Sequence, residues 1–179
     1  MKYIKLFEEL THNKEVDGSQ YFDFNSIEMN GSFENPIYFM LSKSEKYSLI
    51  YISPEEYLKQ VAKGFKTSVE DTLKMVSMPL VDRYVNNMKN GDKFPIGFFI
   101  VGSSHQEGRH RAVAMQKLGV TKFPIVKIEN LTRKDRDEIA LSFKGLTSDE
   151  IDIRVKEMGY RGASDLDKRT IKNYLEYSL

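Results

Sequence analysis

The chain has no cysteine, no long apolar run and almost no excess of charge, and each absence excludes a class of function. Without cysteine there is no disulfide, no thiolate nucleophile and no cysteine-ligated metal. No apolar run approaches the length of a membrane span or of a secretory signal, so we expect a cytoplasmic protein with no membrane partner. Its 27 basic and 26 acidic residues leave a net charge of +1, too little to drive sequence-independent binding to nucleic acid.

The length and composition suit one core of ordinary size, with room for a small helical appendage. There are 179 residues, of which 40% are hydrophobic. We distinguish three parts: an amphipathic helix and an irregular segment over 1–36, a mixed α/β domain over 37–130, and a helical extension over 131–179. The opening MKYIKLFEEL resembles the first residues of many tailed-phage proteins, some of which carry a short peptide that directs packaging into the capsid.

The middle part predicts an α+β fold with a small mixed sheet and surrounding helices. Residues 37–42 and 47–53 read as strands, and Ser53 before Pro54 caps the first of three helices, the last of which stops at Asn90-Gly91. Residues 94–101 then read as one buried strand, 102–108 as a turn, 109–119 as a helix and 123–128 as a second buried strand. This strand–turn–helix–strand order predicts a compact βαβ-like unit.

The polar turn HQEGRHR stands where the first strand of that unit meets its helix. Backbone N–H groups at a helix start have no intrahelical partner and carry partial positive charge, so such a junction readily holds an anion. Gly108 lets the chain turn and lets a ligand approach the backbone. Helical spacing places Arg111 on the side of Met115 and Leu118, which should face the core. A core-facing guanidinium requires a partner, which is either an internal carboxylate or backbone carbonyl, or a bound phosphate or carboxylate.

Arg109 and His110 occupy the same first turn, although cations are favoured at the opposite end of a helix. Three successive basic residues there repel one another and the helix dipole unless an anion offsets them, which favours an anionic ligand. A metal is the other candidate, because His105, Glu107 and His110 offer nitrogen and oxygen ligands. Their spacing matches no zinc pattern such as His-Glu-x-x-His, so we expect no protein-held metal. A divalent ion carried by a nucleotide, with Glu107 assisting, fits better.

The run G-R-H-R-A-x-A-x-x-x-L-G-x-x-x-x-P-I, from Gly108 to Ile125, resembles the phosphate-binding motif of the ParB/sulfiredoxin-like superfamily. The preceding run VDRYVNNMKNGDKFPIGFFI resembles the same family's helix, glycine turn and Pro-Ile strand, so the resemblance covers 47–130. It implies a nucleotide such as ATP, ADP or CTP, with Mg²⁺ as a companion ion. The residues that would contact the nucleotide are Gln106, Gly108, Arg109, His110 and Arg111, and Glu107 would act as general base or metal helper.

Departures from the family pattern narrow the chemistry. Arg109 stands where sulfiredoxin has its catalytic cysteine, so that reaction is excluded, and residues 47–62 lack the second arginine box of ParB CTPases. The pattern therefore predicts nucleotide binding, with phosphoryl transfer or phosphohydrolysis as the accompanying chemistry, in a phage or mobile-element protein. Glu107 pairing with Arg109 or Arg111 is the structural alternative.

Two other functions stay open. The first is a non-enzymatic accessory or DNA-binding protein, because RTIKNYL near the C-terminus resembles the recognition helix of some bacterial regulators. The connection YRGASDLD is longer than the tight turn of a helix-turn-helix, and residues 131–179 carry ten basic and ten acidic side chains. The second is a ParB-like nuclease, which no cluster of catalytic residues supports.

Overall fold

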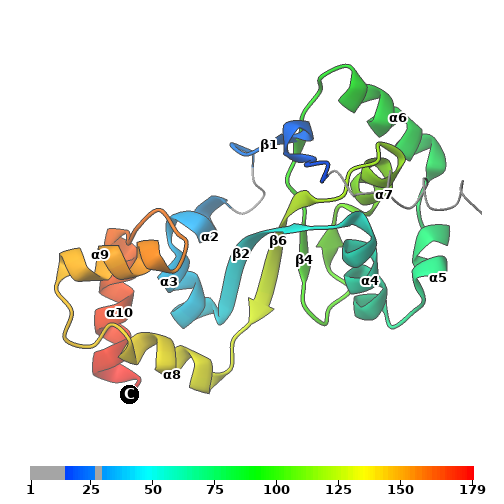
Figure 1. Ribbon diagram of the computed structural model, residues 1–179. Coiled ribbons are helices and arrows are strands. Elements are labelled where there is room, and N and C mark those ends of the chain that lie inside the picture. The colour runs from blue at the N-terminus through cyan, green and yellow to red at the C-terminus, as the bar shows by residue number, and fades with distance from the viewer. Residues whose placement is uncertain (1–14, 27–29) are drawn as a thin grey trace, which may run out of the picture.

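The chain forms a mixed α+β fold, as the sequence predicts, in a computed structural model that describes residues 15–26 and 30–179. The helix expected over 1–10 lies outside the described residues. A small sheet stands between two groups of helices (Figure 1). The strands are β1 Phe22–Asp23, β2 Glu45–Ile52, β3 Phe94–Pro95, β4 Phe98–Ile100, β5 Gln106–Glu107 and β6 Phe123–Asn130. The helices are η1 Ser19–Tyr21, α2 Asn30–Glu34, α3 Pro36–Tyr38, η2 Phe39–Lys43, α4 Pro54–Phe65, α5 Val69–Lys74, α6 Met78–Lys89, α7 Arg109–Lys117, α8 Arg133–Leu141, α9 Ser148–Glu157 and α10 Asp165–Tyr177.

The main sheet has the strand order β2-β6-β4-β5. Strands β2 and β6 are antiparallel and pair over their full length, from Glu45 opposite Asn130 to Ile52 opposite Phe123. Strand β4 is parallel to β6, and β5 returns antiparallel to β4. After β4 the chain passes through β5 and α7 to β6, which lies parallel to β4, so the βαβ-like unit predicted from the sequence is confirmed.

A first core lies between this sheet and helices α4 to α7. Capping residues set the helix ends, because Ser53 accepts the backbone N–H of Glu56 at 3.1 Å and Ser68 accepts that of Asp71 at 3.0 Å. Gly91 and Gly119 follow α6 and α7 with φ of 92° and 69°, the left-handed conformation that glycine adopts without strain. The largest fully buried side chains of this core are Tyr57, Phe22, Phe123, Leu58, Ile96, Met115, Ile125 and Ile128.

A second core joins residues that are far apart in the sequence. The helices α8, α9 and α10 pack against α3 and the π-helix η2, and the buried residues include Ile37, Met40, Leu41, Phe143, Val155 and Ile171. At their centre the fully buried Asp167 accepts the backbone N–H of Tyr38 at 2.8 Å and that of Ser164 at 3.1 Å. Strands β2 and β6 run between the two cores (Figure 1).

Three local predictions differ from the structure. In the segment 102–108, expected to be a turn, Gln106–Glu107 form the short strand β5. Residues 37–42 are helical rather than a strand, because Ile37, Met40 and Leu41 follow the i, i+3, i+4 spacing of a helix and Pro36 begins it. Residues 94–101 form two short strands, β3 and β4, rather than one. The break falls at Gly97, where the chain passes so close to the Glu107 carbonyl that a Cβ atom would lie 2.0 Å from its oxygen.

Candidate functional site

The turn that the sequence singles out lies between β5 and α7. Gly108 precedes the helix with a φ of 137°, which a residue with a side chain rarely adopts, and no side chain caps the first backbone N–H groups of α7. A Cβ atom at Gly108 would lie 3.2 Å from the hydroxyl oxygen of Tyr57. The start of α7 is therefore close-packed against α4 on one side, with its backbone donors left for another partner.

Arg111 points into the core as predicted and is only 5% exposed. Its Nη2 atom donates to Oε1 of Glu107 at 2.8 Å, and its Nη1 atom donates to the carbonyl oxygen of Pro95. Of the partners weighed from the sequence, the structure thus shows an internal carboxylate and a backbone carbonyl. The pairing of Glu107 with an arginine of the motif, the structural alternative for Glu107, is present.

The two partners of this ion pair differ sharply in burial. The side chain of Arg111 is 6% exposed, whereas that of Glu107 is 55% exposed. Arg111 is fixed by its packing and by Pro95, while Glu107 reaches it from the surface. Water can solvate the carboxylate if it leaves the pair, whereas the guanidinium stays buried and would need another anion in its place.

The other two basic residues of the motif have partners on neighbouring helices. The guanidinium of Arg109 lies 5.3 Å from the ring centre of Phe65, and its Nη1 atom lies 3.4 Å from the sulfur of Met75. Nε2 of His110 accepts the backbone N–H of Ser77 at 3.1 Å. Ser77 directly precedes α6, so this bond joins α7 to the start of α6.

His110 is also held in its neutral form. Burial lowers the pKa of its imidazole, and the positive charge of Arg109 lowers it further, against a smaller opposing effect of Glu107. The repulsion expected among three basic residues is relieved in two ways, because His110 is uncharged near neutral pH and Glu107 neutralises Arg111.

Gln106 completes the turn. Its Oε1 atom accepts the hydroxyl of Tyr57 at 2.8 Å, and burial raises the pKa of that hydroxyl. Hydrogen bonds thus connect this turn to two other elements: Gln106 to Tyr57 on α4, and Arg111 to Pro95 on β3. His105 lies apart from them, with Nδ1 3.2 Å from the hydroxyl of Ser103.

A protein-held metal finds no support in the described part of the chain, where no three His, Cys, Asp or Glu side chains gather in a way that could hold an ion. His105 and His110 have the separate partners given above. The remaining histidine, His12, lies outside the described residues.

Sequence reasoning missed the residues that hold the turn from outside. Tyr57, Ser77 and Pro95 come from three other elements, and their roles depend on tertiary contacts that no local pattern reports. Gly97 carried a usable signal, since a glycine inside a strand pattern often marks the close approach of another backbone.

The basic residues that the helix-turn-helix alternative would use lie on α10. On α10, Arg169 and Lys172 are exposed and Lys168 is half-buried, while the acidic Asp167 of the same helix is buried. Among residues 15–26 and 30–179, no helix combines the length and apolarity needed to cross a membrane. Comparison with protein-family models, with curated proteins and with solved structures gives no match to this chain.

Proposed function

We propose that the β5–α7 turn binds the phosphate of a nucleotide such as ATP, ADP or CTP, with Mg²⁺ as a companion ion. The observation that carries the proposal is the asymmetry of the Arg111–Glu107 pair, a buried guanidinium held in place by Pro95 with a counter-ion that is 55% exposed. In this arrangement the carboxylate marks the position that an anionic ligand would take.

Binding would be an exchange of anions. A phosphate oxygen replaces Glu107 at Nη2 of Arg111, and further oxygens accept the backbone N–H groups of Arg109 and His110 in the first turn of α7. Gly108 adds no side chain at the start of the helix, where Tyr57 packs against it. The positive end of the helix and the buried guanidinium then act on the same group, and the charge of Glu107 is released to water.

The displaced carboxylate supplies a group that could take part in a reaction at this site. Once Glu107 leaves Arg111, it stands beside the bound phosphate as the acidic side chain of the motif. It could then orient a water or hold the nucleotide's Mg²⁺ through water, which are the roles that phosphoryl transfer or phosphohydrolysis requires. The resemblance of the run from Gly108 to Ile125 to the ParB/sulfiredoxin-like motif, in a phage or mobile-element protein, supports the same assignment.

The test is a thermal-shift and calorimetric panel of ATP, ADP and CTP, with and without Mg²⁺, on the full chain. A ligand that binds only the folded state raises the unfolding temperature by mass action. Arg111→Met should abolish nucleotide binding measured by calorimetry, whereas Glu107→Gln should tighten binding in the absence of Mg²⁺, because the competing negative charge is gone. The matched control is Arg83→Met, which removes an exposed arginine of α6 and should bind as the wild type does.

The direction of the Glu107→Gln effect separates this function from a purely structural ion pair. A wild type that responds to no nucleotide, together with a Glu107→Gln variant that gains no binding, would refute the proposal. Inorganic phosphate belongs in the panel as well, because binding of phosphate without any preference for nucleotides would limit the site to a simple anion site.

A further inference from the structure

Strand β2 forms one edge of the main sheet, and its outward backbone groups can be identified from the hydrogen-bond pattern. Residues of an antiparallel pair alternate between those bonded to the partner strand and those that point away. The carbonyl of Ser44 accepts the N–H of Leu131 at 2.7 Å, which fixes the even-numbered residues of β2 as those bonded to β6. Pro124, which has no N–H to donate, lies opposite Tyr51, which agrees with odd-numbered residues of β2 not being bonded to β6. The N–H and C=O groups of Tyr47, Leu49 and Tyr51 therefore face the free edge.

Only the first part of this edge is closed. The hydroxyl of Tyr160 donates to the carbonyl of Tyr47 at 2.6 Å. The outward groups of Leu49 and Tyr51 have no hydrogen-bond partner among the described residues, and these two side chains are 36% and 48% exposed. Residues 47–52 contain no charge and no proline, although natural edge strands are commonly protected by one or the other. The edge is thus ready to pair with another strand.

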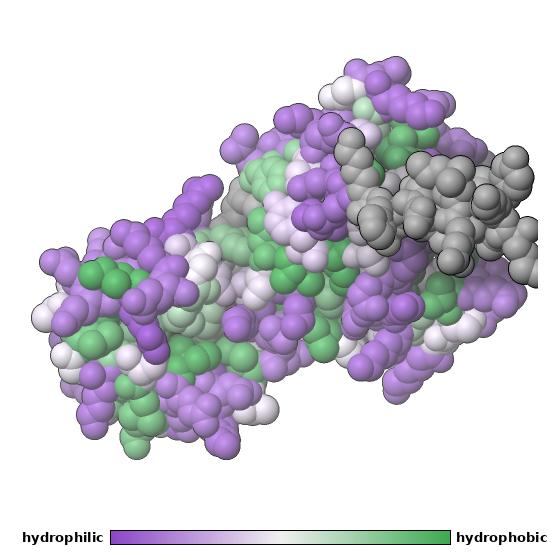
Figure 2. Space-filling model, in the orientation of Figure 1, coloured by the Kyte–Doolittle hydropathy of each residue, from purple (hydrophilic) through white to green (hydrophobic). Residues whose placement is uncertain are grey.

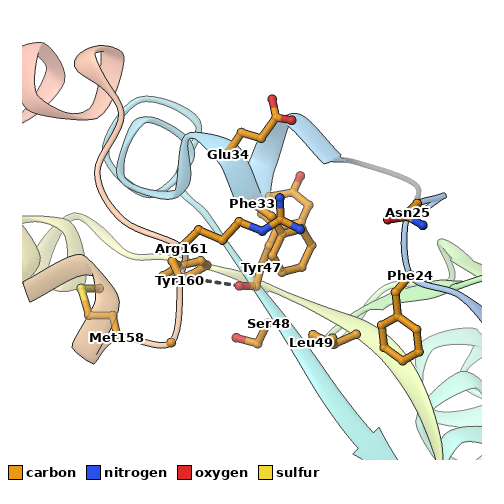
Figure 3. A pocket seen from close by; sticks show the side chains of 11 residues that line it. Phe24, Asn25, Phe33, Glu34, Tyr47, Ser48, Leu49, Met158, Tyr160 and Arg161 are labelled. Carbon is orange, nitrogen blue, oxygen red and sulfur yellow. Dashed lines mark hydrogen bonds between the residues drawn. The ribbon is translucent and has the colours of Figure 1, made fainter. Parts of the chain in front are cut away.

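A groove of about 450 Å³ borders the edge at Tyr47, Ser48 and Leu49, within the range of about 300–1,000 Å³ typical of binding clefts. Its lining includes Phe24 on one side of β2 and Tyr160 with Arg161 on the other (Figure 3). Apolar residues also gather in the middle of the molecule, between the two groups of helices (Figure 2). Two charged residues, Arg161 and Glu34, also line the groove; both are exposed, and neither forms an ion pair with any described residue.

We infer that this edge binds an extended peptide segment of a partner protein, which adds a strand beside Leu49 and Tyr51 and places an acidic side chain on Arg161. Backbone pairing would supply affinity, and the aromatic side chains of the groove and the guanidinium of Arg161 would supply specificity. A single peptide fits better than a second copy of the chain. Two copies paired through β2 would bring the flanking walls at Phe24 and Tyr160 of each molecule against those of the other, whereas an isolated strand meets no such obstacle.

The test is fluorescence anisotropy with labelled hexapeptides that alternate valine and threonine and carry aspartate at the amino or the carboxyl end, titrated with the full chain. We expect saturable binding, slower amide hydrogen exchange at Leu49 and Tyr51, and weaker binding of peptides in which lysine replaces the aspartate. Arg161→Glu should weaken binding of the aspartate peptides by about tenfold or more. Arg83→Glu, the same charge reversal on α6, should leave their affinity within about twofold of the wild type.

Leu49→Pro tests the backbone contribution. The N–H of Leu49 is not part of the pairing with β6, so proline removes the outward donor and leaves the sheet's own bonds in place. This variant should melt cooperatively and bind no peptide, and the Arg161→Glu and hydrogen-exchange results stand if it fails to fold. The inference is overturned if no peptide binds saturably, or if binding is unchanged by Arg161→Glu and leaves the amides of Leu49 and Tyr51 unprotected. It is also overturned if sedimentation shows a dimer that Leu49→Pro dissociates, because the edge would then belong to a second copy.

Discussion

Nη2 of Arg111 lies 2.8 Å from Oε1 of Glu107, and the two side chains meet across the junction where β5 ends and α7 begins. One partner is buried and the other is half-exposed, so removing either one has different consequences. Glu107→Ala leaves a buried guanidinium with Pro95 as its remaining partner, and we expect a loss of about 2–3 kcal/mol in the free energy of unfolding. Arg111→Met leaves a carboxylate that water can solvate, and we expect a loss of about 1 kcal/mol.

Urea unfolding of both variants and of the double variant measures this asymmetry. The double variant should recover most of the loss caused by Glu107→Ala, because no buried charge is left without a partner. A larger loss for Arg111→Met than for Glu107→Ala would contradict the account of the pair.

Gly97 is the position where two backbones approach most closely beside this pair. A Cβ atom there would lie 2.0 Å from the carbonyl oxygen of Glu107 and 3.1 Å from Nη2 of Arg111. Gly97→Ala should therefore lower the free energy of unfolding by about 2 kcal/mol or more. Gly31→Ala in α2 is the control, since nothing lies within 4 Å of its Cβ position, and it should stabilise by about 0.5–1 kcal/mol. Equal stabilities of the two variants in urea would show that the β3–β4 break can relax.

His110 should make stability depend on pH near neutrality. Burial and the charge of Arg109 lower the folded-state pKa of its imidazole, while the unfolded value is about 6.5. The unfolded chain therefore binds more protons in the window below about pH 6.5, so stability is complete above that pH and falls as the pH drops toward the folded value. Protonation also removes the acceptor of the Ser77 N–H.

The measurement is the unfolding temperature between pH 7.5 and 5.5, where carboxylates are still mostly ionised. His110→Gln keeps an acceptor that does not titrate, so its unfolding temperature should change less with pH than that of the wild type. Identical pH profiles for the two proteins would exclude His110 as the titrating group.

Asp167 should be a main determinant of the second core. Its carboxylate is fully buried and accepts the N–H groups of Tyr38 and Ser164. Asp167→Ala leaves both donors without that acceptor, and we expect a loss of about 1–3 kcal/mol in the free energy of unfolding. Asp165→Ala, an exposed residue in the same first turn, should cost about 0.5 kcal/mol or less. Comparable losses in the two variants would mean that the charge at the start of α10, rather than the link to Tyr38, is what matters.

Duplex DNA should bind weakly and lose its binding near physiological salt, because the C-terminal part carries equal numbers of basic and acidic side chains. Neutralising Lys168, Arg169 and Lys172 together should then change little in an electrophoretic mobility assay. Tight, sequence-selective binding at that salt, abolished by the triple variant, would favour the helix-turn-helix alternative.

Local signals predicted much of the fold. A capping residue gave the start of α4, and the cap at Ser53 is confirmed. Glycines predicted the ends of α6 and α7, and the apolar run at 123–128 predicted β6. These predictions succeeded because each signal depends only on residues of the segment itself. The prediction failed at 37–42, where the apolar run 37–41 suits either a strand or a helix and packing against α10 decides between them.

The candidate site was predictable to the same extent. Helical spacing was enough to place Arg111 in the core, because that depends on the residues of α7 alone. The choice of its partners was not, since Pro95 lies on β3, which pairs with β1, and Glu107 lies on β5, which pairs with β4. The partner of His110 comes from α6 and was equally beyond a local pattern.

The hydrogen bond between Tyr38 and Asp167 joins residues 129 positions apart, and this separation has a consequence for synthesis of the chain. When residues 36–43 leave the ribosome, α8, α9 and α10 have not yet been made. Ile37, Met40 and Leu41 must wait for their partners until translation has reached the last helix, although β2, which follows them directly, can pair as soon as β6 emerges. The first core can therefore form during translation, while the second can close only after α10 has been synthesised.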